Sequence, residues 1–421
     1  MRICLASQFG EGLWIAHRMA QEGHDVSAVV SEERYAEALR GLVTTMPGSE
    51  VYEPEKYDLV VFDATGSGDD ADYSREQVPT IGDSSLADKL EEDRLYALDF
   101  MTRCGLQVAP YEAFDNPADG IRHIKKRDRR LVFKPIGEQD DKSTTYVSRD
   151  AQDMLRYFDV LFRSAKVSEY ILQDFVEGVE ASCEVYINST GYYALNGTIE
   201  TKKFLNAELG PNTGCSGSLC WLMPKENTLF DKGLRRCIDP LQQMGYVGPI
   251  DLNTIANAEG IWALEFTPRF GYDATALLAR MLPIGFGDFL YAIASEERPP
   301  DLSAKFPFCA SVRLSIPPYP NEVPPKYVKA GVPIEGLTEE DLDKFFIYDV
   351  RRRGESDDLE SAGLCGWIGS PLAVGDNPGM AFDGAYEMLK HVRIPNGMYR
   401  TDVCEATCKR YWQLREQGLL K

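Results

Sequence analysis

The sequence predicts an α/β protein that continues into α+β units, and two observations support this prediction. Short apolar runs alternate with helical stretches over residues 1–112, a pattern typical of a parallel sheet with helices on both faces. Beyond this point strands and helices mix in another order, and a strand-rich unit begins near Phe306. The 421 residues suffice for about two to four domains with sizeable cores.

The first unit is expected to contain short strands and two clear helices. Three apolar runs predict its strands: 3–6, 26–30 and 59–62. One helix is expected over 13–22, where Gly23 ends it. A longer helix is expected from Asp88 to Cys104, where Gly105 ends it.

The remaining chain is expected to form three further units. Residues 113–190 predict a helix, a strand that ends at Lys134, a polar loop, a helix near 150–162 and two more strands. Residues 191–302 include helices near 229–244 and 275–280, and residues 303–421 include a strand over 309–314 and a helix over 380–392. The predicted bounds of the four units are therefore as follows: 1–112, 113–190, 191–302 and 303–421.

Composition excludes several classes of partner. The net charge of −21 argues against a nucleic-acid backbone, because phosphates need a basic surface. The one basic run, 125–130, precedes a strand and is interpreted as a solvated helix end. No run approaches the roughly 18 apolar residues of a membrane span. We therefore expect neither a nucleic acid nor a membrane as a partner.

Cysteine and histidine usage indicate a reducing compartment and no zinc site. The ten cysteines are scattered without a Cys-x-x-Cys pair, which fits reduced thiols in the cytoplasm. The N-terminal residues resemble a buried strand and lack the features of a secretory signal. The four histidines have no metal-ligand spacing.

Two carboxylates in apolar surroundings indicate a different metal site. Asp251 lies within the apolar run 249–252, and Glu265 lies within 263–266. A buried carboxylate is costly unless it is paired or bound to a metal. On adjacent strands, these two acids would form a hard-oxygen site for Mg²⁺ or Mn²⁺.

The order of these features resembles that of the ATP-grasp ligases. A strand ending in Lys134 precedes a polar loop, a strand at 171–176 leads to Glu180, and the paired acids follow. The segment Gly210–Gly217, which follows Lys202 and Lys203, resembles a motif of the phosphoribosylamine–glycine ligases (glycinamide ribonucleotide synthetases). The stretch 265–271 resembles a second motif of that family. The resemblance implies a two-lobed ATP-grasp core between the N-terminal α/β and C-terminal α+β units.

This resemblance also implies roles for individual residues. Lys134 would bind the phosphates of ATP, and a loop after it would cover them. The backbone at 173–176 would bind the adenine edge. Glu180 would bind the ribose, with Glu177 as the alternative for that role. The implied ATP-binding residues are Lys134, Lys142, Ser143, Thr144, Gln173, Asp174, Val176 and Glu180. Asp251 and Glu265 would bind the metal. Lys202, Asn212 and Arg269 would act on the reacting carboxylate or phosphoryl group.

Three departures from the family bear on the substrates. The covering loop contains Gln139, Asp140 and Asp141, which add negative charge near phosphates, and Thr267 replaces a usual asparagine. The family's glycine-rich first turn is replaced by Ser7–Gly12, and a second loop by Asp63–Asp70. A phosphate on the amine substrate would meet few cations there, so we expect a changed amine or acid.

The expected activity is ATP-dependent carboxylate–amine ligation through an acyl phosphate. Such chemistry depends on positioning and charge neutralisation and needs no protein nucleophile. The expected partners are a small amino acid or other carboxylate and an amine, with the protein as a monomer or small homo-oligomer. One alternative is a catalytically inactive binding or regulatory protein with the same fold. Another is a carboxylase or kinase-like relative.

Overall fold

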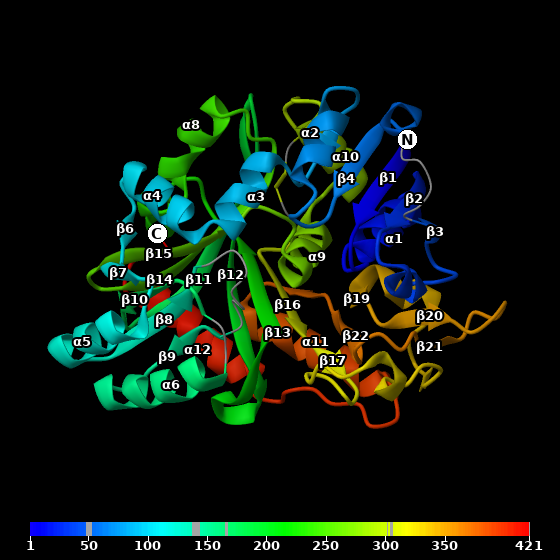
Figure 1. Ribbon diagram of the computed structural model, residues 1–421. Coiled ribbons are helices and arrows are strands. Elements are labelled where there is room, and N and C mark those ends of the chain that lie inside the picture. The colour runs from blue at the N-terminus through cyan, green and yellow to red at the C-terminus, as the bar shows by residue number, and fades with distance from the viewer. Residues whose placement is uncertain (48–52, 137–143, 165–166, 301, 304–305, 421) are drawn as a thin grey trace.

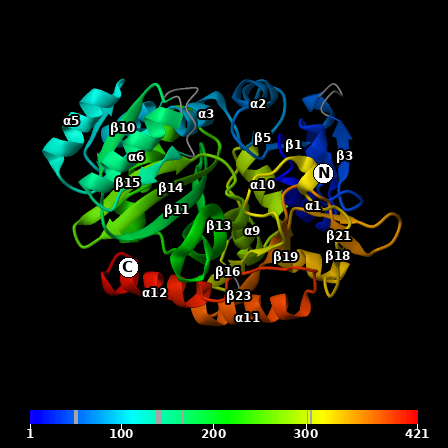
Figure 2. The same cartoon turned by 60° about the horizontal axis from the view of Figure 1, so that its bottom comes forward.

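The computed structural model describes residues 1–47, 53–136, 144–164, 167–300, 302–303 and 306–420. Within them the strands form five sheets. Figure 1 shows a long central sheet, with the N-terminal and C-terminal units on one side of it and a smaller sheet on the other. The two termini lie at opposite ends of the molecule in Figures 1 and 2. The predicted mixture of α/β and α+β units is confirmed.

The N-terminal sheet is parallel and has the strand order β3-β2-β1-β4-β5. Its strands are β1 (Arg2–Ser7), β2 (Asp25–Val30), β3 (Thr44–Pro47), β4 (Leu59–Phe62) and β5 (Thr80–Ile81). Helices α1 (Leu13–Gln21) and α2 (Gly68–Arg75) connect them. Because the strand order reverses between β1 and β4, the loops after these strands border a crevice, the usual ligand position in such sheets.

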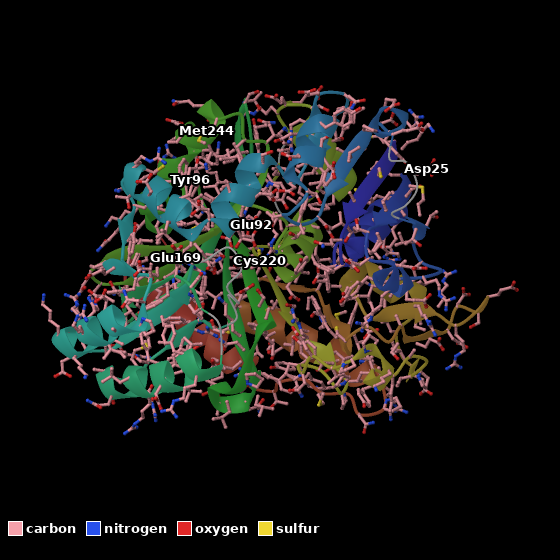
Figure 3. The ribbon with its side chains drawn as sticks, viewed as in Figure 1. Asp25, Glu92, Tyr96, Glu169, Cys220 and Met244 are labelled. Atoms are coloured by element: carbon pink, nitrogen blue, oxygen red, sulfur yellow. The ribbon has the colours of Figure 1, made fainter. Side chains whose placement is uncertain are left out.

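The single helix predicted over 88–104 is in fact two helices. These are α3 (Ser85–Glu92) and α4 (Arg94–Arg103), and Asp93 between them has a non-helical backbone. The carboxylate of Asp93 accepts a 2.9 Å hydrogen bond from the N–H of Tyr96 and so caps α4. Glu92 and Tyr96, labelled in Figure 3, flank this break. The sequence analysis missed Asp93 as an N-cap residue, which marks the start of a second helix within a helix-forming stretch.

The small sheet has the order β7-β10-β8-β9. Its strands are β7 (Tyr111–Phe114), β8 (Leu131–Pro135), β9 (Tyr146–Val147) and β10 (Tyr170–Asp174). Helices α5 (Pro117–Arg127) and α6 (Ala151–Ser164) complete a core around Phe133, Phe158 and Tyr170. The basic run is confirmed as a helix end, since α5 stops at Arg127.

The central sheet has eight strands in the order β23-β16-β13-β12-β11-β14-β15-β6. Their bounds are β6 (Gln107–Val108), β11 (Val179–Asn188), β12 (Gly191–Leu205), β13 (Leu209–Leu222), β14 (Gly248–Asn257), β15 (Gly260–Thr267), β16 (Phe308–Val312) and β23 (Ala373–Gly375). Strand β11 had been expected in the small lobe, but it pairs with β12 and β14. The bounds at 112, 190 and 302 therefore do not separate sheets, and the division into four units stays a prediction.

The remaining helices cover the central sheet and the C-terminal strands. They are α7 (Thr228–Lys232), α8 (Arg235–Gln243), α9 (Tyr272–Met281), α10 (Phe286–Ala294), α11 (Pro378–His391) and α12 (Val403–Glu416). Figure 2 shows α11 and α12 along one side of the molecule, below the long strands. In the described part of the chain no single helix is long and apolar enough to cross a membrane, whereas the bent pair α9 and α10 passes that test by length and composition alone.

Two small antiparallel sheets complete the C-terminal unit. One has the order β17-β22-β19 and the other β18-β21-β20. Their strands are β17 (Leu314–Ser315), β18 (Pro333–Ile334), β19 (Phe345–Ile347), β20 (Val350–Arg352), β21 (Leu359–Ser361) and β22 (Trp367–Pro371). Trp14 of α1 stacks near Phe346 and donates a 3.0 Å hydrogen bond to the carbonyl of Phe345, which fixes the N-terminal unit to this one.

Candidate active site

One face of the central sheet is polar across four neighbouring strands. Side chains two residues apart share a face, and cross-strand partners point the same way. Glu184 lies opposite Asn196 on β12 and opposite Asp251 on β14. By the same register and alternation, this face carries Glu180, Ser182, Glu184, Asn196, Thr198, Glu200, Lys202, Asp251, Asn253, Glu265 and Thr267.

Lys134 lies near the end of β8 and is buried. Burial and then the charge of Arg94 lower the pKa of its ammonium group to about 8, against the opposing effect of the carboxylates of Glu265 and Glu180. These influences place Lys134 within electrostatic reach of the polar face. A buried, partly compensated cation suits the binding of an anionic ligand.

Lys202 and Glu180 form an ion pair across the face. The ammonium group of Lys202 donates to Oε1 of Glu180. Although burial opposes the shift, Glu180 and Glu200 together raise the pKa of Lys202. Lys202 therefore stays charged, and one of the two oxygens of the predicted ribose ligand is already engaged.

The predicted metal ligands lie on adjacent strands, as expected, but not directly opposite each other. Asp251 is paired with Thr267, and Glu265 is paired with Asn253. Asp251 is half-buried, and its Oδ1 is fully buried without a hydrogen-bond partner. Burial, with Glu184 and Glu200 nearby, raises the pKa of Asp251 well above its ordinary range. A cation on this face would relieve that repulsion.

Asn253 is a candidate metal ligand that the sequence reasoning missed. Its Nδ2 donates to Oγ1 of Thr267 at 3.3 Å, which directs the amide and leaves Oδ1 as an oxygen donor beside Glu265. Thr267 occupies the position where an asparagine had been expected. In the structure, Asn253 of the neighbouring strand β14 brings an asparagine side chain beside Thr267. The signal was present, because Asn253 is two residues from Asp251 and shares its face.

Asp251, Asn253 and Glu265 together provide oxygen atoms of the kind that Mg²⁺ binds. In the parts of the chain described above, no group of three or more His, Cys, Asp or Glu side chains has metal-ligand geometry. Magnesium in nucleotide sites usually takes only one or two carboxylates and completes its shell with phosphates and water. The two acids and the amide therefore fit such an ion.

Arg269 connects the central sheet to the N-terminal unit. Its Nε lies 3.0 Å from Oε1 of Glu91 at the end of α3, and its guanidinium lies 5.3 Å from the ring of Tyr272. The phenol of Tyr272 is 3.1 Å from the carboxylate of Glu11 in the loop after β1. Burial opposes the charge of Arg269, but Glu91 and the neighbouring groups raise its pKa.

Comparisons with known proteins agree with this geometry. The family model of the phosphoribosylglycinamide synthetase ATP-grasp (A) domain matches residues 92–275. That range contains Lys134, Glu180, Lys202, Asp251 and Glu265. Residues 92–275 therefore resemble the ATP-grasp domain of the phosphoribosylglycinamide synthetases.

Curated relatives extend the likeness of this chain beyond the matched domain. It is 23% identical over 346 residues to the phosphoribosylamine–glycine ligase of Leptospira interrogans, with 79% of each chain covered. It is 24% identical over 351 residues to that of Streptomyces coelicolor, covering 79% of this chain and 80% of the relative. The crystal structure of the Thermotoga maritima phosphoribosylamine–glycine ligase superposes with a TM-score of 0.73 at 20% identity, covering 96% of this chain and all of that one.

The same fold also occurs in enzymes of other names. An ADP complex of N5-carboxyaminoimidazole ribonucleotide synthetase gives a TM-score of 0.59 at 15% identity, covering 92% of this chain and 96% of that one. The biotin carboxylase of Campylobacter jejuni gives 0.66 at 12% identity, covering all of this chain and 97% of that one. At these identities the likeness concerns the fold.

Several residues predicted to contact a nucleotide have other partners in the structure. Gln173 is buried and donates to the carbonyl of Ala109 at 3.1 Å, and the carboxylate of Asp174 binds Arg127 and Arg129. Val176 lies half-buried after β10. Lys142 and Ser143 lie outside the described residues. The backbone role proposed for 173–176 stays a prediction.

The segment around Asn212 differs from its prediction. The resemblance had implied a loop at 212–214 that holds the acyl substrate, but residues 209–222 are strand β13, and Asn212 is exposed opposite Lys203. The hairpin tip lies instead at 206–208. Long-range pairing with β12 overrides the local turn preference of glycine and proline. Thr213 is the buried member of the segment, and its hydroxyl donates to the carbonyl of Lys202 at 3.1 Å.

The loops after β1 and β4, where the sequence analysis placed departures from the family, border the N-terminal crevice and contact each other. The carboxylate of Asp63, after β4, accepts hydrogen bonds from Ser7 at 2.5 Å and from the N–H of Gly12 at 2.7 Å. A Cβ on Gly12 would lie 2.3 Å from that of Asp63, so only glycine permits this approach. Burial raises the pKa of Asp63 to about 6.

Proposed function

We propose that this protein is an ATP-dependent carbon–nitrogen ligase that joins a small carboxylic acid to an amine. The observation that supports this most is the polar face that carries Glu180, Lys202 and Glu265 inside the matched ATP-grasp domain, with Lys134 of β8 within electrostatic reach of it. A carboxylate oxygen attacks the γ-phosphorus of ATP and ADP leaves. The amine nitrogen then attacks the acyl carbon, inorganic phosphate leaves and one proton is released.

The chain's own residues neutralise charge and orient the reactants in this scheme. Lys134 binds the phosphates, and Glu180, held by Lys202, binds the ribose. Arg269 is placed between the central sheet and the N-terminal crevice, where the transferring phosphoryl group and the amine meet. Asp251, Asn253 and Glu265 would hold Mg²⁺ or Mn²⁺, which supplies positive charge to the phosphates.

The N-terminal crevice supports an amine that carries no phosphate. Phosphate groups commonly bind to free backbone N–H groups at the start of a helix. Before α2, however, the N–H groups of Gly66 and Gly68 donate to Asp88 at 2.5 and 3.0 Å, and the N–H of Ser67 donates to buried Asp83 at 2.7 Å. In the loop after β1, Gly12 donates to Asp63. Carboxylates thus occupy the donors that a phosphate would use.

The alternative of an inactive binding protein receives no support from the described residues, because the lysines and the acids of the polar face are all present. A carboxylase would consume bicarbonate, and a kinase-like enzyme would leave a stable phosphorylated product. We expect the enzyme to be cytoplasmic, to act on small molecules and to work as a monomer or small homo-oligomer.

The deciding experiment measures ADP release from MgATP with a panel of amino acids, glycine first, and a panel of amines. Phosphoribosylamine is included, and products are identified by mass spectrometry. ADP together with an amide product supports the ligase. Saturable turnover of phosphoribosylamine would contradict the proposal of an unphosphorylated amine, and ADP release that needs bicarbonate would favour a carboxylase. Absence of ADP under every condition would contradict the ligase itself.

A further inference from the structure

A cavity of about 420 Å³ lies at the outer end of strands β12 and β13. Its walls come from the β12–β13 hairpin, from the segment that follows β16, and from the stretch before α12. The apolar part of the lining consists of Phe204, Leu205, Leu209, Tyr319, Met398 and Tyr399. The volume falls within the usual range of small-molecule sites, about 300–1,000 Å³.

The apolar lining is unusually open to solvent. Leu205 is 49% exposed, Leu209 is 61% exposed and Tyr399 is 39% exposed. Large apolar side chains grouped around a hollow commonly mark a ligand site, whereas scattered single ones need no explanation. This group therefore points to an occupant with an apolar body.

The polar part of the lining consists of Asn206, Ser216, Ser315 and two buried arginines, and both arginines are already neutralised. Arg313 binds Asp273 at 2.5 Å, and Arg400 binds Glu208 and Asp402, each at 2.9 Å. A charged group on the ligand, besides its carboxylate, would therefore find little uncompensated charge in this cavity. Arg313 is 8% exposed, however, and its buried Nε–H has no hydrogen-bond partner. One neutral acceptor on the occupant could receive it.

The cavity adjoins the candidate active site through short contacts. Its wall residue Ser216 is 2.9 Å from the hydroxyl of Thr213, which in turn donates to the carbonyl of Lys202. Arg400 donates to the carbonyl of the next residue, Lys203, at 2.8 Å. Hydrogen bonds thus connect the cavity wall to the backbone of Lys202 and Lys203.

We propose that this cavity holds the side chain of the carboxylic-acid substrate, and that this substrate is an amino acid with a large, mostly apolar side chain. The inference rests on the proposed ligase function. The carboxylate lies toward Lys202, and the side chain extends between Leu205, Leu209 and Met398. A hydroxyl or other neutral acceptor on that side chain meets Nε of Arg313. Glycine would leave the whole cavity unfilled.

The test compares glycine with L-leucine, L-phenylalanine and L-tyrosine in the ADP-release assay, for the wild-type protein and for Leu205→Trp, which narrows the cavity. Met380→Trp is the control, because Met380 is 51% exposed and lies on α11, outside the cavity lining. We expect kcat/KM to be at least about tenfold higher for a large side chain than for glycine, a difference of about 1.4 kcal/mol. Leu205→Trp should lower the ratio of kcat/KM for the large amino acid to that for glycine at least fivefold. Met380→Trp should leave this ratio unchanged.

Calorimetric binding of the same amino acids to the protein without ATP separates the possible failures. ADP release with glycine alone, unaffected by Leu205→Trp, would leave the ligase in place and overturn the cavity assignment. No turnover, but binding of L-phenylalanine that Leu205→Trp weakens, would overturn the ligase and support the cavity. Neither turnover nor binding would overturn both.

Discussion

Asn253 lies directly opposite Glu265 on the paired strands β14 and β15. Its amide is oriented by Thr267, so its oxygen and the carboxylate of Glu265 border the same small region of the polar face. The guanidinium of Arg94 lies 3.9 Å from Oε2 of Glu265. This arrangement makes Glu265 the centre of the proposed metal site, with oxygen donors on one strand and a cation from α4 beside it.

The first prediction concerns Glu265 itself. Glu265→Gln keeps the size of the side chain but removes its charge, and we expect ADP release to fall by about 100-fold or more, because metal bridging of phosphates contributes several kcal/mol. Glu259→Gln, in an exposed turn after β14, is the matched control and should keep its activity. Nearly full activity of Glu265→Gln would refute the metal assignment.

The second prediction separates the two partners of Glu265. Asn253→Leu removes an oxygen donor and should raise the Mg²⁺ concentration for half-maximal rate by about tenfold, equivalent to about 1.4 kcal/mol. Asp251→Asn should raise it as well if Asp251 is a ligand as predicted. The measurement is a magnesium titration of the initial rate at saturating substrates. If the Mg²⁺ concentration for half-maximal rate is unchanged in Asp251→Asn but raised in Asn253→Leu, Asp251 is not a ligand, and Asn253 and Glu265 bind the metal.

The third prediction is a pH dependence set by Lys134. Its pKa of about 8, against an ordinary 10.5, means that the charge is lost as the pH rises through 8. Because phosphates need the charged form, kcat/KM for ATP should fall by up to about tenfold per pH unit above that value. Between pH 8 and 10.5 the unfolded chain binds more protons at this group, so the group's contribution to stability rises with pH. Titration of Lys134 would therefore not unfold the protein, and the fall in kcat/KM above pH 8 would reflect lost binding of ATP.

Lys134→Arg provides the control for this pH profile. A guanidinium group stays charged over this range, so the decline above pH 8 should disappear even if the maximal rate is lower. A wild-type profile that is flat to pH 10, or an arginine variant that declines at the same pH, would contradict the assignment.

The fourth prediction tests the break between α3 and α4. Asp93→Ala removes the cap of α4 and should lower the free energy of unfolding by about 0.5–2 kcal/mol. Asp93→Asn, which can still cap, should restore most of it. Denaturation in urea measures both variants. If Asp93→Ala has wild-type stability, the capping bond to Tyr96 contributes little.

The fifth prediction concerns the buried pair of Arg313 and Asp273. Both side chains are nearly inaccessible, and Asp273 also accepts a 3.1 Å hydrogen bond from Ser370. Asp273→Ala would leave the guanidinium buried without its counter-charge and should destabilise the protein by about 3–5 kcal/mol. The double change Asp273→Ala with Arg313→Met should recover part of that loss, which urea denaturation would show. Equal stability of the single variant and the wild type would contradict this account.

Much of the fold could be predicted because local patterns determine it. The alternation of apolar strands and amphipathic helices located β1, β2, β4 and α1 within one or two residues. The basic run that begins in the last turn of α5 was likewise identified as a helix end. The break at Asp93 was missed, because the residues on both sides of it favour a helix and only the cap marks the boundary.

The candidate site depends more on pairings that are remote in the sequence. The acids at 251 and 265 could be recognised by their apolar surroundings, but which residue faces Glu265 depends on the register of β14 and β15, which the sequence does not reveal. Asn212 was expected in a loop, because its strand partner Lys203 lies across a hairpin. The carboxylates that occupy the N–H groups of Gly66 and Gly68 come from α3, 20 or more residues away.

The central sheet also has a consequence for how the protein is made. Its two edge strands are β6, near residue 107, and β23, near residue 374. Strands β12 and β13 are therefore synthesised long before β16 and β23 can cover the open edge of β13. A nascent chain that stops short of residue 308 exposes that edge to other chains. We expect truncations that remove residues 308–421 to aggregate rather than to yield a smaller active protein.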